Sequence, residues 1–316
     1  MLLKKLSLCL ALTIVLSGCT SRVNIKGNKA EPYKPTVPTN SGTKPGKDGP
    51  MSKPTNVTIA PSYPMLPDHF IPNKKPFTPV EVSNYLELQT KNISWSWKYS
   101  PKSNAALLLK YHGYAFGDTT SKVIYLTFDE GYENGYTASI LDTLKANNVQ
   151  AAFFVTDPYI TGAFNGMKNL DLLKRMSNEG HLICNHSVHH MSMSSFIDET
   201  KFDQELIGVQ SRLDNIPGLK MAKFFRPPMG DFSELSLYYT QKLGYKSIFF
   251  SLAYNDWDPK NQPDPVMAKQ TLLKDTQPGM ICLLHPEGKT NASILDALIK
   301  EWTSLGYQFK SLNELP

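Results

Sequence analysis

The chain has 316 residues, of which 41% are apolar and 19% charged, and it contains four cysteines. This composition is ordinary for a globular protein, and it excludes a wholly disordered chain, a collagen-like chain, a polytopic membrane protein and a disulfide scaffold. The formal charge of +5 comes from residues 1–67, whose net charge is +7, while the remaining residues carry a net charge of −2. The basic balance therefore does not indicate that the folded part binds nucleic acid.

The N-terminus resembles the signal of a bacterial lipoprotein. Two lysines precede a nearly all-apolar run over residues 6–16, which is too short to span a bilayer, because spanning needs about 20 residues. The run ends in Leu-Ser-Gly-Cys at 16–19, which resembles a lipobox, in which the peptide is cut before the cysteine and the thiol carries a lipid. We expect residues 1–18 to be removed and Cys19 to anchor the exported protein at the outer face of a bacterial membrane. A plain signal peptide with an incidental cysteine is the alternative.

Residues 19–70 are predicted to form a Pro-rich disordered linker. They contain nine of the 23 prolines, interleaved with Gly, Ser, Thr, Asn and Lys. Such a segment buries too little apolar surface to offset its ordering entropy. Its lysines either attract anionic lipid or wall polymer or simply keep the linker soluble.

From residue 121 onward, strand and helix patterns alternate. Apolar runs predict seven strands, at 123–128, 151–155, 181–184, 223–226, 246–251, 280–284 and 307–310. Amphipathic patterns predict helices between them, at 135–147, 169–178, 199–213, 233–243, 265–274 and 291–304. Repeated β-α units imply a parallel sheet with right-handed crossovers. The sequence therefore predicts an α/β fold, a distorted or incomplete (β/α) barrel of about seven parallel strands.

Residue types that carry chemistry follow these predicted strands. They are Asp129 and Glu130 after the first strand, His186 and His190 after the third, Arg226 at the end of the fourth, Asp256 and Trp257 after the fifth, and His285 after the sixth. The carboxyl ends of the strands share one rim of a β/α barrel, where the active site lies. Five clusters far apart in the sequence are therefore expected to meet at one mouth.

Two of these clusters point to metal binding and proton transfer. His186 and His190 are four residues apart, so on a helical turn both imidazoles face the same way and can share a metal ion. Asp129 and Glu130 are adjacent at a strand end, where side chains alternate in direction, so one can act as a base and the other as a ligand. Without context, the first pair is more often two ordinary histidines and the second a solvated turn.

Together the clusters resemble the polysaccharide deacetylase family with the NodB homology domain, carbohydrate esterase family 4. Five motifs of that family appear in order: Thr127-Phe128-Asp129-Glu130-Gly131, His186-Ser187-Val188-His189-His190, Arg226-Pro227-Pro228-Met229-Gly230, Asp256-Trp257 and Leu283-Leu284-His285. The stretches 128–137, 251–257 and 306–312 are similar to the muramic-acid deacetylases that produce the δ-lactam of spore-cortex peptidoglycan. The resemblance implies a NodB-type deacetylase domain over 121–316, with residues 71–120 packing on the barrel as an N-terminal extension.

The resemblance also implies a metal and a base. His186, His190 and an acidic residue at position 130 would hold a divalent metal, with Zn the default and Co or Mn the alternatives. Asp129 would be the general base that takes the proton of water. Most of the family has Asp where this chain has Glu130, so the extra methylene of Glu130 either moves its carboxylate off the metal or lets it bind from a shifted backbone. His189 has no role in the family.

The remaining motifs imply an acid and substrate contacts. His285 would protonate the leaving amine, Arg226 would pair with the base, and Asp256 would pair with the acid histidine. Substrate contacts are implied for three residues, Tyr132, Trp257 and Met229, the last through its backbone N–H.

The leading hypothesis is a metal-dependent deacetylase of N-acetylmuramic acid in peptidoglycan. Its substrate would first lose its peptide to an N-acetylmuramoyl-L-alanine amidase, and the freed amine would then close the δ-lactam. The alternatives are a general chitooligosaccharide or N-acetylglucosamine deacetylase and a non-catalytic wall-binding lipoprotein. We expect a monomer that binds no nucleic acid, with Cys184 and Cys282 either buried free thiols or a disulfide.

Overall fold

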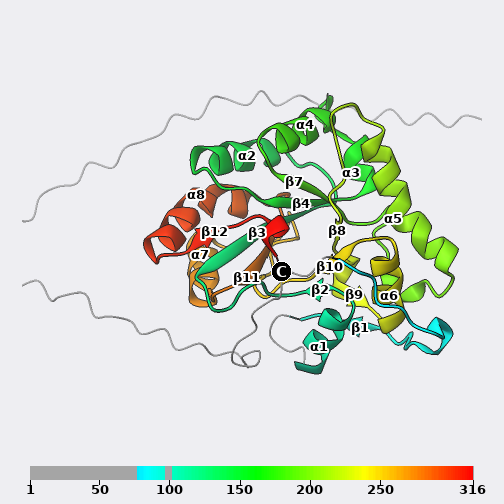
Figure 1. Cartoon of the computed structure of the whole chain (residues 1–316). Coiled ribbons are helices and arrows are strands. Elements are labelled where there is room, and N and C mark those ends of the chain that lie inside the picture. Colours follow the sequence, from blue (N-terminus) through cyan, green and yellow to red (C-terminus); the bar gives the residue numbers. More distant parts are fainter. Residues whose placement is uncertain (1–76, 97–101, 316) are drawn as a thin grey trace, which may run out of the picture. The chain divides into compact units, whose positions relative to one another are not determined.

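A curled parallel sheet forms the centre of the fold (Figure 1). The structure is a computed structural model that describes residues 77–96 and 102–315. The segments predicted to be a signal peptide (1–18) and a linker (19–70), together with Cys19, which is predicted to carry a lipid, lie outside the described residues.

Seven strands cross the sheet in the order β11, β3, β4, β7, β8, β10 and β2. Every neighbouring pair is parallel. In that order the strands are Met280–Leu284, Val123–Glu130, Ala152–Val155, Leu182–Asn185, Phe224–Phe225, Lys246–Ile248 and Gly113–Tyr114. An eighth strand, β12 (Gln308–Phe309), pairs with the start of β3. The predicted parallel α/β barrel is therefore confirmed, and all seven predicted strands are present.

Within the described part of the chain, the two ends of the sheet meet through isolated bridges. Leu252, beyond the end of β10, forms a parallel bridge to Cys282 on β11. Phe116, just after β2, forms an antiparallel bridge to Met280. The barrel is therefore distorted at this seam, where a continuous ladder is replaced by single contacts.

Helices cover the outside of the sheet (Figure 1). The crossover helices are α2 (Thr137–Ala146), α4 (Leu170–Asn178), α5 (Glu199–Asp214), α6 (Glu234–Lys242), α7 (Pro265–Lys274) and α8 (Lys289–Ser304). The starts of α5 and α6 follow from capping residues in the sequence. The Asp198 side chain accepts the Lys201 backbone N–H at the start of α5, and Ser233 forms a capping box with Ser236 at the start of α6.

Shorter elements complete the described chain. They are α1 (Lys102–Lys110), α3 (Asp157–Thr161), the antiparallel pairs β1 (Ile93–Ser94) with β9 (Asp231–Phe232) and β5 (Ala163–Phe164) with β6 (Met167–Lys168), and four 3-10 turns, Tyr85–Glu87, Met193–Ser195, Pro228–Gly230 and Leu312–Glu314.

The two faces of β3 pack into different environments, because side chains alternate along a strand. Val123 and Tyr125 belong to a small cluster with Phe154 and Cys184 from neighbouring strands. Ile124 and Phe128, which alternate with them, belong to the larger core shared with the helices. This alternation continues to the end of β3, so it also decides where Asp129 and Glu130 point.

The described residues before β3 pack against the rest of the fold. Trp95 is buried, and its Nε1 donates to the Phe250 carbonyl at 2.7 Å. The backbone N–H and carbonyl of Val80 both bond the side chain of Gln241, each at 2.8 Å. β2 lies in this region, and a two-residue strand that begins with Gly leaves no apolar run by which the sequence could have predicted it.

Cys184 and Cys282 are buried free thiols in the structure, which confirms the first of the two predicted alternatives for this pair. None of the helices in the described part of the chain is long and apolar enough to cross a membrane.

Candidate active site

A cavity of about 710 Å³ opens at the carboxyl ends of the barrel strands. Its walls include eight of the predicted site residues: Asp129, Tyr132, His186, His190, Arg226, Met229, Trp257 and His285. These residues come from the ends of β3, β7, β8 and β11 and from the loops that follow β8 and β10. The expected convergence of distant motifs at one mouth is thus observed.

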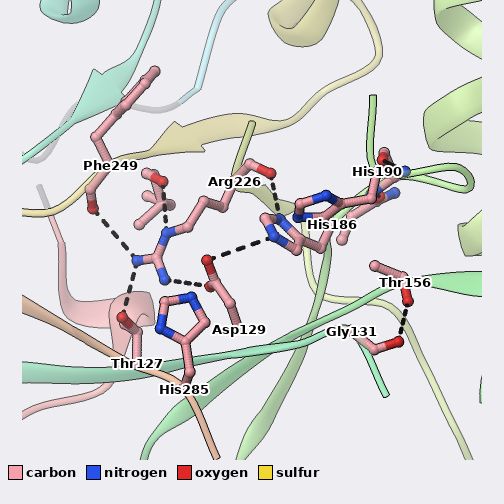
Figure 2. A network of polar contacts seen from close by, with 12 residues as sticks. Thr127, Asp129, Gly131, Thr156, His186, His190, Arg226, Phe249 and His285 are labelled. Carbon is pink, nitrogen blue, oxygen red and sulfur yellow. Dashed lines mark hydrogen bonds and ion pairs between the residues drawn. The ribbon is translucent and has the colours of Figure 1, made fainter. Parts of the chain in front are cut away.

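Asp129 and Arg226 are buried residues that line the cavity and pair with each other (Figure 2). Arg226 Nη1 donates to Asp129 Oδ1 at 2.6 Å, and its Nη2 donates to Thr127 Oγ1 at 2.9 Å. Arg226 Nε donates to the Ile248 carbonyl at 3.1 Å. Burial raises the pKa of Asp129, but the charge of Arg226 and of the nearby histidines outweighs burial, and the pKa falls below its usual value. Asp129 is therefore an ionised carboxylate, held in one orientation and able to accept a proton.

The two histidines of the second motif stand next to this carboxylate. His186 Nε2 lies 3.5 Å from Asp129 Oδ2, and the rings of His186 and His190 are 4.9 Å apart between centroids. The predicted helical turn is wrong, because Ser187 (φ 71°) and His190 (φ 53°) both adopt left-handed backbone conformations. A tight irregular turn, rather than the spacing of a helix, brings the rings together.

The donor chemistry of these residues fits a divalent metal. Burial lowers the pKa of His186 to about 4 and also lowers that of His190, so both imidazoles are neutral, the form in which histidine can bind a metal. His186 Nδ1 donates to the Arg226 carbonyl at 2.8 Å, the kind of outer contact that orients metal-binding histidines. Among residues 77–96 and 102–315, no group of three His, Cys, Asp or Glu side chains is arranged to hold a metal ion.

Glu130, the predicted third ligand, points away from the histidines. As the last residue of β3 it faces the helix side, where its Oε1 accepts from Thr137 Oγ1 at 3.3 Å. Its Oε2 is buried and has no hydrogen-bond partner among the described residues. Burial, with the nearby carboxylates of Glu287 and Glu133, raises the pKa of Glu130 well above its usual value. The alternation of side chains along β3 therefore separates Glu130 from Asp129.

His285 and Asp256 form a second charged pair at the same cavity. His285 Nδ1 donates to Asp256 Oδ1 at 2.7 Å, and its backbone N–H donates to Oδ2 at 2.9 Å. Asn291 Nδ2 donates to the same Oδ2 at 2.6 Å. Burial lowers the pKa of His285, but the Asp256 carboxylate more than compensates and raises the pKa to about 9. His285 is therefore a protonated imidazole near neutral pH.

Apolar side chains surround the mouth of the cavity. Tyr132, Met229 and Trp257 line it and are 49%, 59% and 64% exposed. Met229 lies in the turn Pro228–Gly230 with φ 59° and ψ 5°, a left-handed conformation uncommon for a side chain of this size. Exposed apolar groups around a cavity that also contains charged side chains suit a ligand such as a sugar ring, which has both apolar faces and hydroxyl groups.

Sequence reasoning missed Glu287. Glu287 lines the cavity and is buried, with Oε1 accepting the Gly131 backbone N–H at 3.0 Å. Its backbone carbonyl accepts from Asn134 Nδ2 at 2.8 Å. Burial raises the pKa of Glu287 to about 7. Its place two residues after His285 was the available signal, because residues that follow the carboxyl end of a barrel strand lie near the same mouth.

Comparison with known proteins gives consistent matches. A family model described as polysaccharide deacetylase matches residues 116–248. The chain is 39% identical over 231 residues to the peptidoglycan-N-acetylmuramic acid deacetylase PdaA of Bacillus subtilis. This match covers 71% of this chain and 85% of PdaA. The chain is 30% identical over 206 residues to a peptidoglycan-N-acetylglucosamine deacetylase of Bacillus cereus, covering 64% of this chain and 71% of that relative. The solved structure of Bacillus subtilis PdaA, a family 4 carbohydrate esterase, superimposes with a TM-score of 0.67 at 39% identity over 72% of this chain and 97% of that one.

Proposed function

This chain belongs to the polysaccharide deacetylase family, and we propose that it removes the acetyl group from N-acetylmuramic acid in peptidoglycan. The observation that carries the proposal is that two ion pairs lie at one cavity, Asp129 with Arg226 and His285 with Asp256. The first ion pair keeps the Asp129 carboxylate ionised, and the second keeps the His285 imidazole protonated. Such a pair provides a base and an acid at the same pH.

The base and the acid act on opposite parts of the acetamide. Asp129 accepts a proton from the water that attacks the acetyl carbon, and Arg226 keeps the carboxylate in place. The carbon–nitrogen bond breaks as His285 gives its proton to the leaving nitrogen, which yields acetate and a free amine. Without that proton the leaving group would be an amide anion, which leaves poorly. The Met229 backbone N–H, at the left-handed turn beside the cavity, is the proposed donor to the oxyanion.

We propose that His186 and His190 hold a divalent metal, with Zn the default and Co or Mn the alternatives. When bound, such an ion polarises the acetyl carbonyl and makes water more acidic. The fit rests on two neutral imidazoles beside the Asp129 carboxylate. Glu130 is not a part of this proposed set, because its side chain faces Thr137.

The proposed substrate is a muramic residue from which an N-acetylmuramoyl-L-alanine amidase has already removed the peptide. The freed amine would then close on the lactyl carboxylate and form the muramic δ-lactam of spore cortex. Support comes from the 39% identity to the N-acetylmuramic acid deacetylase PdaA. The 30% identity to an N-acetylglucosamine deacetylase keeps glucosamine as the second candidate substrate.

Digestion of defined glycan tests the proposal directly. The purified protein is incubated with amidase-treated and untreated peptidoglycan, and the products are weighed by mass spectrometry. We expect loss of acetyl from muramic residues in the treated glycan only. Deacetylation confined to glucosamine would instead support the second candidate. No deacetylation of either sugar by the wild-type protein would support the remaining alternative, a non-catalytic wall-binding lipoprotein.

We further propose that the protein is exported and acts as a monomer tethered to the outer face of the membrane. The lipobox-like sequence that ends at Cys19 and the Pro-rich segment 19–70 support this location. Metabolic labelling with a radioactive fatty acid tests it, since a Cys19→Ala variant should take up no label.

A further inference from the structure

The loop that follows β3 brings Tyr132 to the mouth of the cavity. β3 ends at Glu130 and α2 begins at Thr137, so residues 131–136 form neither a helix nor a strand. Tyr132 lines the cavity and is 49% exposed. A side chain on such a loop has a defined position only if neighbouring elements hold the backbone of the loop.

Gly131, the residue before Tyr132, is held from both sides. Glu287 Oε1 accepts the Gly131 backbone N–H at 3.0 Å. Thr156 Oγ1 donates to the Gly131 carbonyl at 3.0 Å (Figure 2). Farther along the loop, Asn134 Nδ2 donates to the Glu287 carbonyl at 2.8 Å. The loop is therefore tied to Glu287 on both sides of Tyr132.

Glu287 belongs to the loop that carries the proposed acid, His285. β11 ends at Leu284, where it pairs in parallel with Phe128 of β3. The loops after these two strands therefore leave the sheet next to each other. The Glu287 side chain connects the loop of the acid with the loop that follows the base.

The carboxyl group that makes this connection is an unfavourable one to bury. Glu287 is only 6% exposed, and its Oε2 has no hydrogen-bond partner among the described residues. A buried polar atom without a partner lowers stability, and such groups in native proteins call for a functional reason. The bond that the Glu287 carboxyl group makes fixes the peptide next to Tyr132, so the reason lies at the cavity.

Tyr132 is suited to contact a sugar. Burial raises the pKa of Tyr132, and the carboxylates of Glu287 and Asp258 raise it further, so the phenol is neutral at physiological pH. Asp258 follows Trp257, which also lines the mouth. The flat apolar face of an aromatic ring matches the apolar face of a sugar ring.

We propose that Glu287 holds Tyr132 in position against a sugar ring of the substrate and thereby sets the affinity of the protein for glycan. The inference rests on the proposed function and adds to it a residue that acts on substrate binding. Glu287 is a positioning residue, because it acts through the ring of Tyr132.

A double-mutant cycle tests this assignment. Glu287→Met keeps a side chain of similar size but lacks the oxygen that accepts the Gly131 N–H, whereas Glu287→Gln keeps such an oxygen and removes the charge. Each variant is made alone and together with Tyr132→Ala. Acetate release from amidase-treated glycan at about pH 7 gives kcat and KM separately, with Zn added at one fixed level. Sedimentation with insoluble glycan gives the dissociation constant of the same proteins.

The two single variants that remove the contact should weaken binding alike. We expect Tyr132→Ala and Glu287→Met each to raise KM about tenfold, which corresponds to about 1.4 kcal/mol, with kcat changed by less than about threefold. The double variant should also show a rise of about tenfold, because the tie to Glu287 has no ring left to position. Glu287→Gln should keep KM within about twofold of the wild type, since it still accepts the Gly131 N–H.

Glu234→Met is the matched control. The Glu234 side chain also accepts a backbone N–H, that of Gln89 at 3.4 Å, but Glu234 does not line the cavity. Its KM should stay near that of the wild type even if its melting temperature falls. If Glu287→Met does not fold, Asn134→Ala takes its place in the cycle, because it removes another tie between the same loop and Glu287.

The outcomes separate the two proposals. A double variant whose KM rises about 100-fold, the product of the single effects, would show that Glu287 acts independently of Tyr132. An unchanged KM in Glu287→Met, or an equal rise in Glu287→Gln, would also overturn the assignment, while acetate release from muramic residues by the wild type would leave the proposed function standing. If the wild type releases no acetate from muramic residues, the proposed function fails, and the dissociation constants decide the assignment: coupled losses of binding support it, and multiplied or absent losses overturn it.

Discussion

Replacing Asp256 by Asn should move the alkaline limit of activity, because Asp256 sets the protonation of His285. The pKa of His285 is about 9 with the carboxylate in place, against a usual value of 6.5. At about pH 8 the acid would be mostly protonated in the wild type and only a few per cent protonated in the variant, a loss of roughly 30-fold in kcat/KM. At about pH 6 both proteins would hold the proton, and this effect should be less than about twofold.

The same pair has a consequence for stability. Because the pKa of His285 is raised above its unfolded value, the pairing stabilises the fold fully below about pH 6.5 and loses this effect as the pH rises through about 9. The raised pKa corresponds to about 3 kcal/mol of differential interaction. The melting temperature of Asp256→Asn should therefore differ from that of the wild type more at about pH 6 than at about pH 10.

Acetate release from amidase-treated glycan between about pH 5 and 10 is the assay. Asn291→Ala is the matched control, because it removes the 2.6 Å hydrogen bond to Asp256 Oδ2 but leaves the charge. It should keep the alkaline limit near that of the wild type. An Asp256→Asn profile that falls by the same factor at every pH would refute this reasoning, since it would mean that Asp256 only orients the ring.

Four further predictions follow from the contacts and the metal proposal. Exhaustive chelation should abolish acetate release and added Zn should restore it, whereas full activity after chelation would contradict a role for metal. Arg226→Lys keeps a positive charge but loses the planar set of donors, so kcat should fall by about 100-fold, and a change below about threefold would show that the charge alone suffices. Gly279→Ala should lower the free energy of unfolding in urea by about 3 kcal/mol, because φ is +72° and a Cβ would lie 2.5 Å from the Asp118 carbonyl oxygen. Gly218→Ala, with φ +82° and no described atom within 4 Å of the new Cβ, should lower it by about 1 kcal/mol, and equal costs would exclude the clash. The buried thiols of Cys184 and Cys282 should react with a thiol reagent only after unfolding, and rapid labelling of the native protein would show that the strands open.

The sequence predicted the barrel because its central strands leave apolar runs. A strand buried on both faces needs such a run, as in β3 and β11, whose residues are all buried. β2 has only two residues and begins with Gly113, so its pairing with β10 depends on tertiary contacts that no local pattern records. The Leu252–Cys282 bridge was unpredictable for the same reason.

Within the site, it was easier to predict which residues take part than the direction in which each side chain points. Asp129 and Arg226 were expected to pair, and they do so at 2.6 Å. The turn around His190 was predicted as a helix because four-residue spacing suits one, but two left-handed residues produce the same proximity of rings. Side-chain direction depends on where a strand ends, and the sequence does not fix that boundary to one residue.

Glu130 shows how a difference of one residue in strand length decides to which side of the sheet a side chain points. β3 runs through Glu130, so the period of two places Asp129 on the side of the cavity and Glu130 on the side of Thr137. A strand that ended one residue earlier would free position 130 to turn toward the histidines. Its buried, unpartnered Oε2 and its raised pKa are the cost of the longer strand. The charges of the cavity are balanced independently of Glu130: the proposed base, Asp129, has its cation in Arg226, and the proposed acid, His285, has its anion in Asp256. Between the lowered pKa of Asp129 and the pKa of about 9 of His285, both groups hold their working charges across the whole neutral range.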